Sequence, residues 1–212
     1  MFQEMINGSI AVLTKPSVST FEEHEKNNLA WALIYSVIAG VINAILAALR
    51  AALFPAVALD TAGLPPELAE GLQQGAAGPG IVGAVVGAII FTILGLLIGW
   101  GITYALGRAF GGTGQFGELA YDLSLFNAPT TVVFSILNFI PILGGLAALA
   151  LGIYNLYLTY LAIQSGMNLP SNKALYVILI QFAIALAIGL CFFLFFAAIL
   201  AAVIGGSGGF AP

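Results

Sequence analysis

Charged side chains are scarce in this chain. Lys, Arg, Asp and Glu make up 7% of its 212 residues, whereas a soluble domain usually carries about 25%. The nine acids and five bases give a formal net charge of −4, which is too small to steer a charged partner. The composition therefore excludes an ordinary soluble enzyme, a disordered chain and a basic nucleic-acid-binding domain, and we expect no nucleic-acid partner.

Cysteine and histidine occur once each, as Cys191 and His24. A single cysteine excludes a disulfide framework and every cysteine-rich metal module. His24 stands among glutamates, but successive residues of a helix do not converge on one ion, so we predict no metal site. The chain offers no Ser-His-Asp set and no paired aspartates within an apolar run. We therefore predict no enzyme, no catalytic residues and no cofactor.

Long apolar runs, by contrast, dominate the chain. Hydrophobic residues make up 61% of it, and a helix that spans a membrane needs about 20 of them in a row. We predict an all-α polytopic membrane protein, a bundle of five transmembrane helices at residues 29–49, 81–106, 123–140, 142–163 and 174–204. Pro141 divides the third run from the fourth, because proline cannot continue a helix. If this region is a re-entrant hairpin instead, the count falls to four or three.

The remaining segments flank this membrane domain (29–204). Residues 55–80 form an acidic loop rich in proline and glycine, and residues 205–212 form a glycine-rich tail. Within the N-terminal segment 1–28, apolar residues recur at helical spacing over residues 2–13. This helix either lies along the membrane surface or packs on the bundle. The apolar residues are Phe2, Met5, Ile6, Ile10 and Leu13.

The basic residues predict an orientation, because cytoplasmic loops carry an excess of Lys and Arg. With five spans, Lys15, Lys26, Arg108 and Lys173 fall on one side. Arg50 falls on the other side, together with the acidic loop. We therefore expect a cytoplasmic N-terminus and an external C-terminus.

Glycines four residues apart mark one face of the second span, as Gly83-x-x-x-Gly87 and Gly95-x-x-x-Gly99. Small residues at this spacing let two helix backbones approach closely in lipid. The pattern predicts an interaction face, filled either by another helix of this chain or by a partner.

Amide side chains are the main polar groups inside the apolar runs. None of the runs contains an acid or a base, which argues against a pump or a proton-coupled carrier. The amides have two interpretations, as interhelical hydrogen bonds or as the lining of a polar pathway. The candidates for the pathway are Asn43, Asn138, Asn155 and Gln181.

The loop between the second and third spans is rich in glycine, at residues 111–116. It lacks the lysine and the preceding strand of a phosphate-binding loop, so we predict a turn between two helices. Arg108, Glu118 and Asp122 flank this turn. They predict either a salt-bridged loop, with Asp122 capping the third span, or a docking site for a cytoplasmic protein or a lipid headgroup.

These features together resemble the Yip-domain family over residues 12–204. The resemblance rests on five spans, a short N-terminal segment and four local patterns in order. The patterns are Pro16 with Thr20-Phe21, Gly111-Gly112-x-Gly114-x-Phe116, Tyr121 with Leu125 and Pro129, and Asn168-Leu169-Pro170 with Lys173-Ala174.

The resemblance implies a membrane protein that associates with other proteins, and no catalytic residues. Eukaryotic members bind Rab GTPases and carry a long cytosolic N-terminal region with an acidic and aromatic motif. Residues 1–28 lack this motif, so we expect no Rab partner and a protein of the short, prokaryotic type in a cytoplasmic membrane. We predict a non-enzymatic scaffold, adaptor or accessory subunit that contacts membrane lipids and either another membrane protein or a second copy of itself. The alternative is a small transporter, channel or lipid-handling protein.

Overall fold

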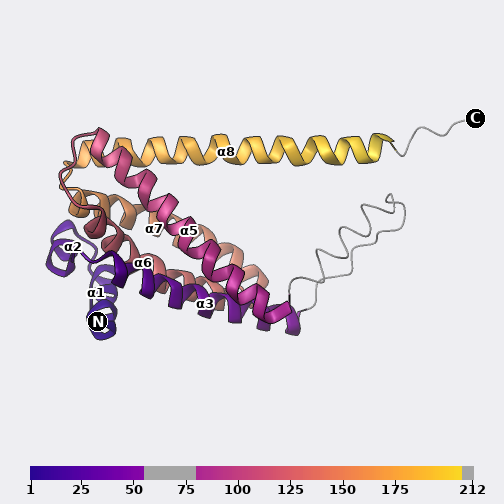
Figure 1. Cartoon of the computed structure of the whole chain (residues 1–212), viewed down its shortest axis with the longest axis horizontal. Coiled ribbons are helices and arrows are strands. Elements are labelled where there is room, and N and C mark those ends of the chain that lie inside the picture. The colour runs from indigo at the N-terminus through magenta and orange to yellow at the C-terminus, as the bar shows by residue number, and fades with distance from the viewer. Residues whose placement is uncertain (55–79, 207–212) are drawn as a thin grey trace, which may run out of the picture.

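The computed structural model describes residues 1–54 and 80–206, and the regular structure within these ranges is entirely helical. The predicted loop 55–80 and tail 205–212 lie outside the described residues, except for Gly80, Gly205 and Gly206. Figure 1 shows the arrangement of the seven described helices. They are α1 (Phe2–Thr14), α2 (Val18–His24), α3 (Leu29–Leu53), α5 (Gly80–Ala109), α6 (Phe116–Leu137), α7 (Pro141–Gly166) and α8 (Ser171–Gly206).

Each predicted apolar run forms one long helix. The break at Pro141 is confirmed, because α6 ends at Leu137 and Pro141 occupies the first turn of α7. A proline is tolerated there, since the first N–H groups of a helix have no partner within it. The start of α6 was predicted too late. It begins at Phe116, where the side chains of Gln115 and Glu118 form a reciprocal capping box.

Four helical segments are long and apolar enough to cross a membrane. They are Leu29–Leu53, Ile89–Ala109, Gly144–Gly166 and Ser171–Ile199. The helix α6 is not among them, and it differs in burial, since twelve of its 22 residues are buried. The structure therefore supports four candidate spans among the described residues. The fifth span remains a prediction.

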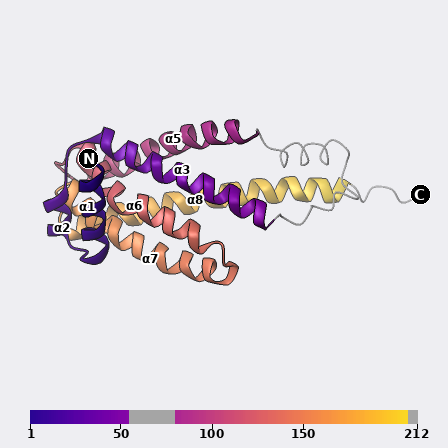
Figure 2. The same ribbon diagram turned by 90° about the horizontal axis from the view of Figure 1, so that it is seen from below.

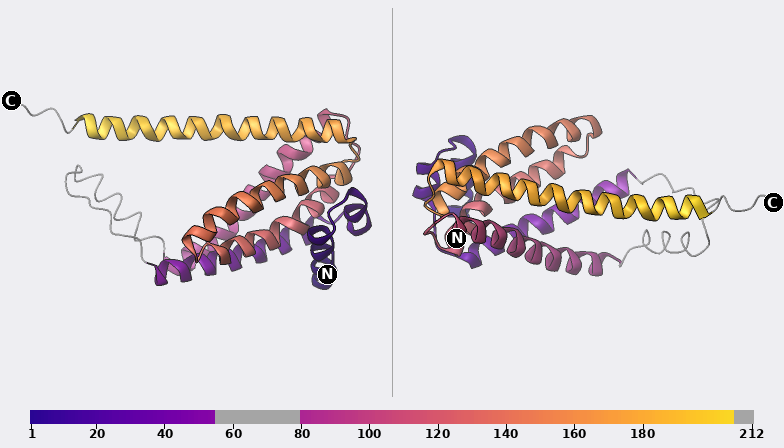
Figure 3. Two further views of the ribbon diagram at one scale, coloured as in Figure 1. Left: turned by 180° about the vertical axis from the view of Figure 1, so that it is seen from behind. Right: turned by 90° about the horizontal axis from the view of Figure 1, so that it is seen from above.

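The core lies at one end of the bundle, which we call the packed end. Here α3, α6 and α8 begin while α5 and α7 finish (Figure 2). Tyr121, Phe126 and Leu125 of α6 are fully buried in this core, together with Leu158 and Met167 near the end of α7. Toward the opposite, open end α8 leaves the other helices, as the left view of Figure 3 shows, whereas α6 stays in contact with α3 and α7.

The helix α8 is held at the packed end alone. Ala174, Val177 and Ile178 are buried, but every side chain from residue 182 to residue 199 is exposed. Figures 1 and 3 show α8 leaving the other helices beyond this point. Most of its apolar surface therefore contacts no described part of the chain.

The helix α1 packs against the side of the bundle near the packed end. It buries Met5, Gly8, Ser9 and Val12. Hydrogen bonds fix this position. The Ser9 and Tyr35 hydroxyls are 3.0 Å apart, and the Tyr154 hydroxyl donates to the Leu13 carbonyl at 2.6 Å.

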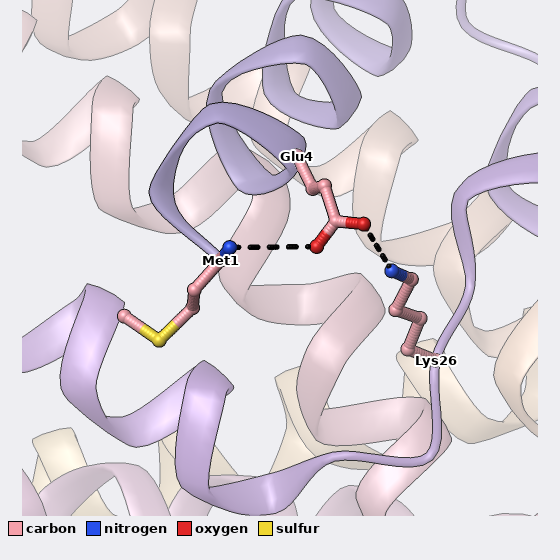
Figure 4. Close-up of polar contacts among 3 residues, drawn as sticks. All are labelled: Met1, Glu4 and Lys26. Carbon is pink, nitrogen blue, oxygen red and sulfur yellow. Dashed lines mark hydrogen bonds and ion pairs between the residues drawn. The ribbon is translucent and has the colours of Figure 1, made fainter.

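At its N-terminus, α1 is joined to the segment before α3 by ion pairs (Figure 4). The Glu4 carboxylate lies 2.9 Å from the Lys26 ammonium and 3.5 Å from the amino group of Met1. The structure thus shows α1 packed on the bundle. Phe2, Ile6 and Ile10 of α1 are exposed, and their contact with the membrane surface stays a prediction.

The glycine-rich segment 111–114 joins α5 to α6, as the sequence predicted, and it also touches the end of α7. The Thr113 N–H donates to the Met167 carbonyl at 3.0 Å. A Cβ atom at Gly114 would collide with the Gly166 carbonyl, and one at Gly166 would lie 2.7 Å from the Leu119 Cα. Glycine is required because backbone meets backbone at this junction.

We expect Gly114→Ala to destabilise the protein by about 1–3 kcal/mol, because the added methyl group forces the loop away from α7. Thermal unfolding in detergent micelles measures this loss. Gly189→Ala on α8 is the matched control, since a Cβ atom there meets nothing within 4 Å. Equal unfolding temperatures for the two variants would show that the junction tolerates a side chain.

Candidate functional site

The helix α6 carries two distinct polar regions. Near the packed end it contributes Glu118 and Asp122 to a carboxyl cluster that also includes Glu25 and Glu22. Toward the open end it lines a polar cleft with Ser135 and Asn138, opposite α3.

Asp122 is the most unusual member of the carboxyl cluster. It is 0% exposed, and neither of its carboxyl oxygens has a hydrogen-bond partner among the described residues. Burial raises the pKa of Asp122 well above its usual value, and the charge of Glu25 raises it further. The nearby Ser165 hydroxyl favours ionisation, but it forms no regular hydrogen bond with the carboxyl group. Burial therefore favours the neutral form of Asp122.

Glu25 is half-buried just after the end of α2. Burial, followed by the charges of Glu118 and Glu22, raises its pKa to about 7. Its Oε1 atom is buried without a hydrogen bond in the described structure. A carboxyl group in this position changes its charge near neutral pH.

The predicted salt-bridged loop is wrong. Arg108 donates instead to the Gly112 carbonyl at 3.0 Å, and the Glu118 carboxylate accepts from the Gln115 N–H at 2.7 Å. Asp122 does not cap the helix, because α6 begins six residues earlier. Its burial also keeps Asp122 from touching a docked partner, whereas Arg108 is exposed and Glu118 half-buried. A docking role for these two residues stays a prediction.

The polar cleft has a volume of about 530 Å³. Two smaller clefts lie beside it, of about 240 and 130 Å³. Each pair of clefts has one lining residue in common, which is Phe134 for the first and second, Asn43 for the first and third, and Thr131 for the second and third. A partly polar seam thus runs along α6 between the neighbouring helices.

Three of the four predicted pathway amides make interhelical hydrogen bonds. The Asn43 carbonyl accepts from the Ser135 hydroxyl, and the Asn155 amide donates to the Thr130 hydroxyl at 3.2 Å. Gln181 donates to Thr103 at 2.5 Å and thereby ties α8 to α5. Asn138 donates to the Phe134 carbonyl of its own helix.

The same amides also line the seam, with one exception. Asn43 and Asn138 line the polar cleft of about 530 Å³, and Asn155 lines one of the smaller clefts. Gln181 lines none of the three. Arg50 and Ser135 also line the polar cleft, and the sequence did not predict this role for them. The spacing of Asn43 and Arg50, seven residues apart on one helix face, was the available signal.

Three of the four glycines of the predicted face on α5 have open space beside them. Cβ atoms built at Gly87, Gly95 and Gly99 meet no atom within 4 Å. The face is therefore open toward the surroundings of the bundle. No group of three or more His, Cys, Asp or Glu residues in segments 1–54 and 80–206 is placed to hold a metal ion.

The family model of the Yip1 domain matches residues 10–194 of the chain. The chain belongs to the Yip1 domain family. Its helices, like its composition, identify it as an integral membrane protein, and the family is one of non-catalytic membrane proteins. No curated protein and no solved structure matches the chain.

The carboxyl cluster predicts that stability depends on pH. Glu25 has a raised pKa in the folded state, so its contribution is complete below about pH 4.5 and is lost as the pH rises to about 7. The pKa of Asp122 is also raised in the folded state. Its contribution to stability is therefore complete at low pH and begins to be lost as the pH rises past the ordinary pKa of an aspartate. We expect the free energy of unfolding to fall between about pH 5 and pH 7, by at most about 1.4 kcal/mol per pH unit for each proton. The unfolding temperature in detergent reports this fall.

Glu25→Gln should flatten this slope, because the amide does not titrate. The exposed Glu23→Gln variant serves as the control and should keep the slope of the wild-type protein. If Glu25→Gln retains the full slope as well, Glu25 does not contribute to the pH dependence.

Proposed function

We propose that this protein is a non-enzymatic scaffold or accessory subunit of a membrane assembly. The observation that carries the proposal is the open glycine face of α5, together with the unpacked length of α8. Exposed apolar side chains alone are ordinary in lipid. Glycines that admit a backbone at close range, and yet have no neighbour, are typical of a helix that awaits another helix.

The proposed topology has five spans. The helix α6 carries the third span, the predicted run 123–140, whose length of about 27 Å at 1.5 Å per residue is close to a hydrocarbon core of about 30 Å. Its carboxyl groups lie in the first two turns, at the packed end, where the basic residues Lys26, Arg108 and Lys173 also gather. This distribution supports a cytoplasmic packed end and N-terminus.

The proposed partner is a helix of another membrane protein or of a second copy of this chain. Either would place its own apolar face against Gly95 and Gly99. A Rab GTPase is not proposed, because the N-terminal segment is occupied by the packing of α1 and α2 on the bundle.

The double variant Gly95→Leu/Gly99→Leu should remove association by filling the open face. The protein would be extracted with its native lipids in polymer nanodiscs, with two differently tagged copies in one cell. Co-purification of the tags reports self-association, and mass spectrometry reports a stoichiometric partner. The expected result is at least a tenfold loss of either species, since helix packing of this kind is sensitive to one bulky side chain.

Gly101→Leu provides the matched control. It lies on the same helix, a Cβ atom there also meets nothing within 4 Å, and helical geometry places it on another face. Equal recovery of partners from both variants would contradict the assembly role.

A second candidate is transport or lipid handling, which the polar seam along α6 supports. A flux or lipid-scrambling assay in liposomes tests this function. Asn155→Leu should abolish activity that depends on the seam, whereas Cys191→Ala, exposed on α8, should leave it unchanged. Absence of activity across a broad panel of solutes and lipids would remove this candidate.

A further inference from the structure

The polar cleft combines one face of α3 with one face of α6. Its volume of about 530 Å³ falls within the range of small-molecule sites. The cleft is partly open, so a ligand can enter it. The lining residues are Asn43, Leu46, Ala47, Arg50, Ala51, Phe54, Phe134, Ser135 and Asn138.

The position of Arg50 along α3 sets the depth of the cleft in the membrane. Arg50 follows Leu29, the first residue of the helix, by 21 positions, or about 32 Å. This distance equals the thickness of the hydrocarbon core, so Arg50 reaches the level of the headgroups if Leu29 lies at the other boundary. Asn43 lies about 10 Å deeper, near the level of the acyl chains.

The polar groups of the cleft favour an anion. The Arg50 guanidinium, which offers five donors, makes no hydrogen bond or ion pair with the described residues. The Asn43 carbonyl is engaged by Ser135, which leaves the amide NH₂ group without a described partner. No carboxylate of the described residues lines the cleft, so an amine would find no counter-charge among them.

We propose that this cleft binds the phosphate of an anionic phospholipid from the leaflet on the Arg50 side. Arg50 binds the phosphate oxygens in a charge-assisted contact. The Asn43 amide donates to an ester oxygen below, and an acyl chain lies against Leu46 and Phe134. A lipid is the source of the phosphate because both lining helices expose apolar side chains, among them Ile45, Leu49 and Ile136. This inference does not depend on the proposed assembly role.

Native mass spectrometry of the delipidated full chain in detergent, titrated with phosphatidylglycerol, tests the site. We expect saturable binding of one lipid. Arg50→Gln should weaken it about tenfold, as expected for loss of a charge-assisted hydrogen bond. Lys15→Gln is the matched control, because Lys15 is an exposed cation outside the cleft, and it should bind like the wild-type protein.

A second variant keeps the cation and closes the space. Ala47→Trp retains Arg50 but fills the cleft, and it should lose the bound lipid. This result keeps the test decisive even if Arg50→Gln unfolds. Undiminished binding by Ala47→Trp, or equal losses in Arg50→Gln and Lys15→Gln, would overturn the site.

Two further titrations identify the source of the phosphate. Phosphatidylcholine should bind several-fold more weakly than phosphatidylglycerol, because its ammonium group finds no carboxylate in the cleft. Glycerol phosphate at the same concentration should not displace the lipid. Displacement by glycerol phosphate would assign the site to a soluble phosphate ester, and equal binding of both lipids would overturn the preference for an anionic headgroup.

Discussion

The contact between the glycine loop and the end of α7 is the constraint on which the rest of the structure depends. Gly112, Gly114 and Gly117 bring the connection between α5 and α6 into backbone contact with its neighbours, including Gly166 and Met167 at the end of α7. Hydrophobic burial gives no drive between helices in lipid, so close backbone packing has to supply the cohesion. One junction thereby fixes the ends of three helices and the start of α8.

Burial follows directly from this arrangement. The large buried side chains cluster within two or three turns of the junction, and α8 leaves the other helices with distance from it. The polar clefts lie farther from the junction, where α6 still faces α3 and α7. The open glycine face on α5 lies along the same region. Side chains are thus mostly buried at the packed end and mostly exposed toward the open end.

Much of the fold could be predicted from local sequence signals. Apolar runs gave the long helices, Pro141 gave the break between α6 and α7, and the glycine loop gave the turn before α6. The burial of Asp122 could not be predicted, because a carboxyl at a helix start is ordinarily solvated. It is covered here by Gly166, which is distant in sequence. The place of Arg50 and Ser135 in the polar cleft could not be predicted for a similar reason. Their cleft depends on Ser135 meeting Asn43, 92 residues away.

Because α8 is attached at one end only, a given tilt displaces its distant residues the most. Its last described attachment is Gln181, which donates to Thr103 of α5. Cys191 follows Gln181 by about 15 Å along the helix axis. A tilt of about 10° at Gln181 would therefore displace the Cys191 thiol by about 3 Å while the buried first turns of α8 stay in place.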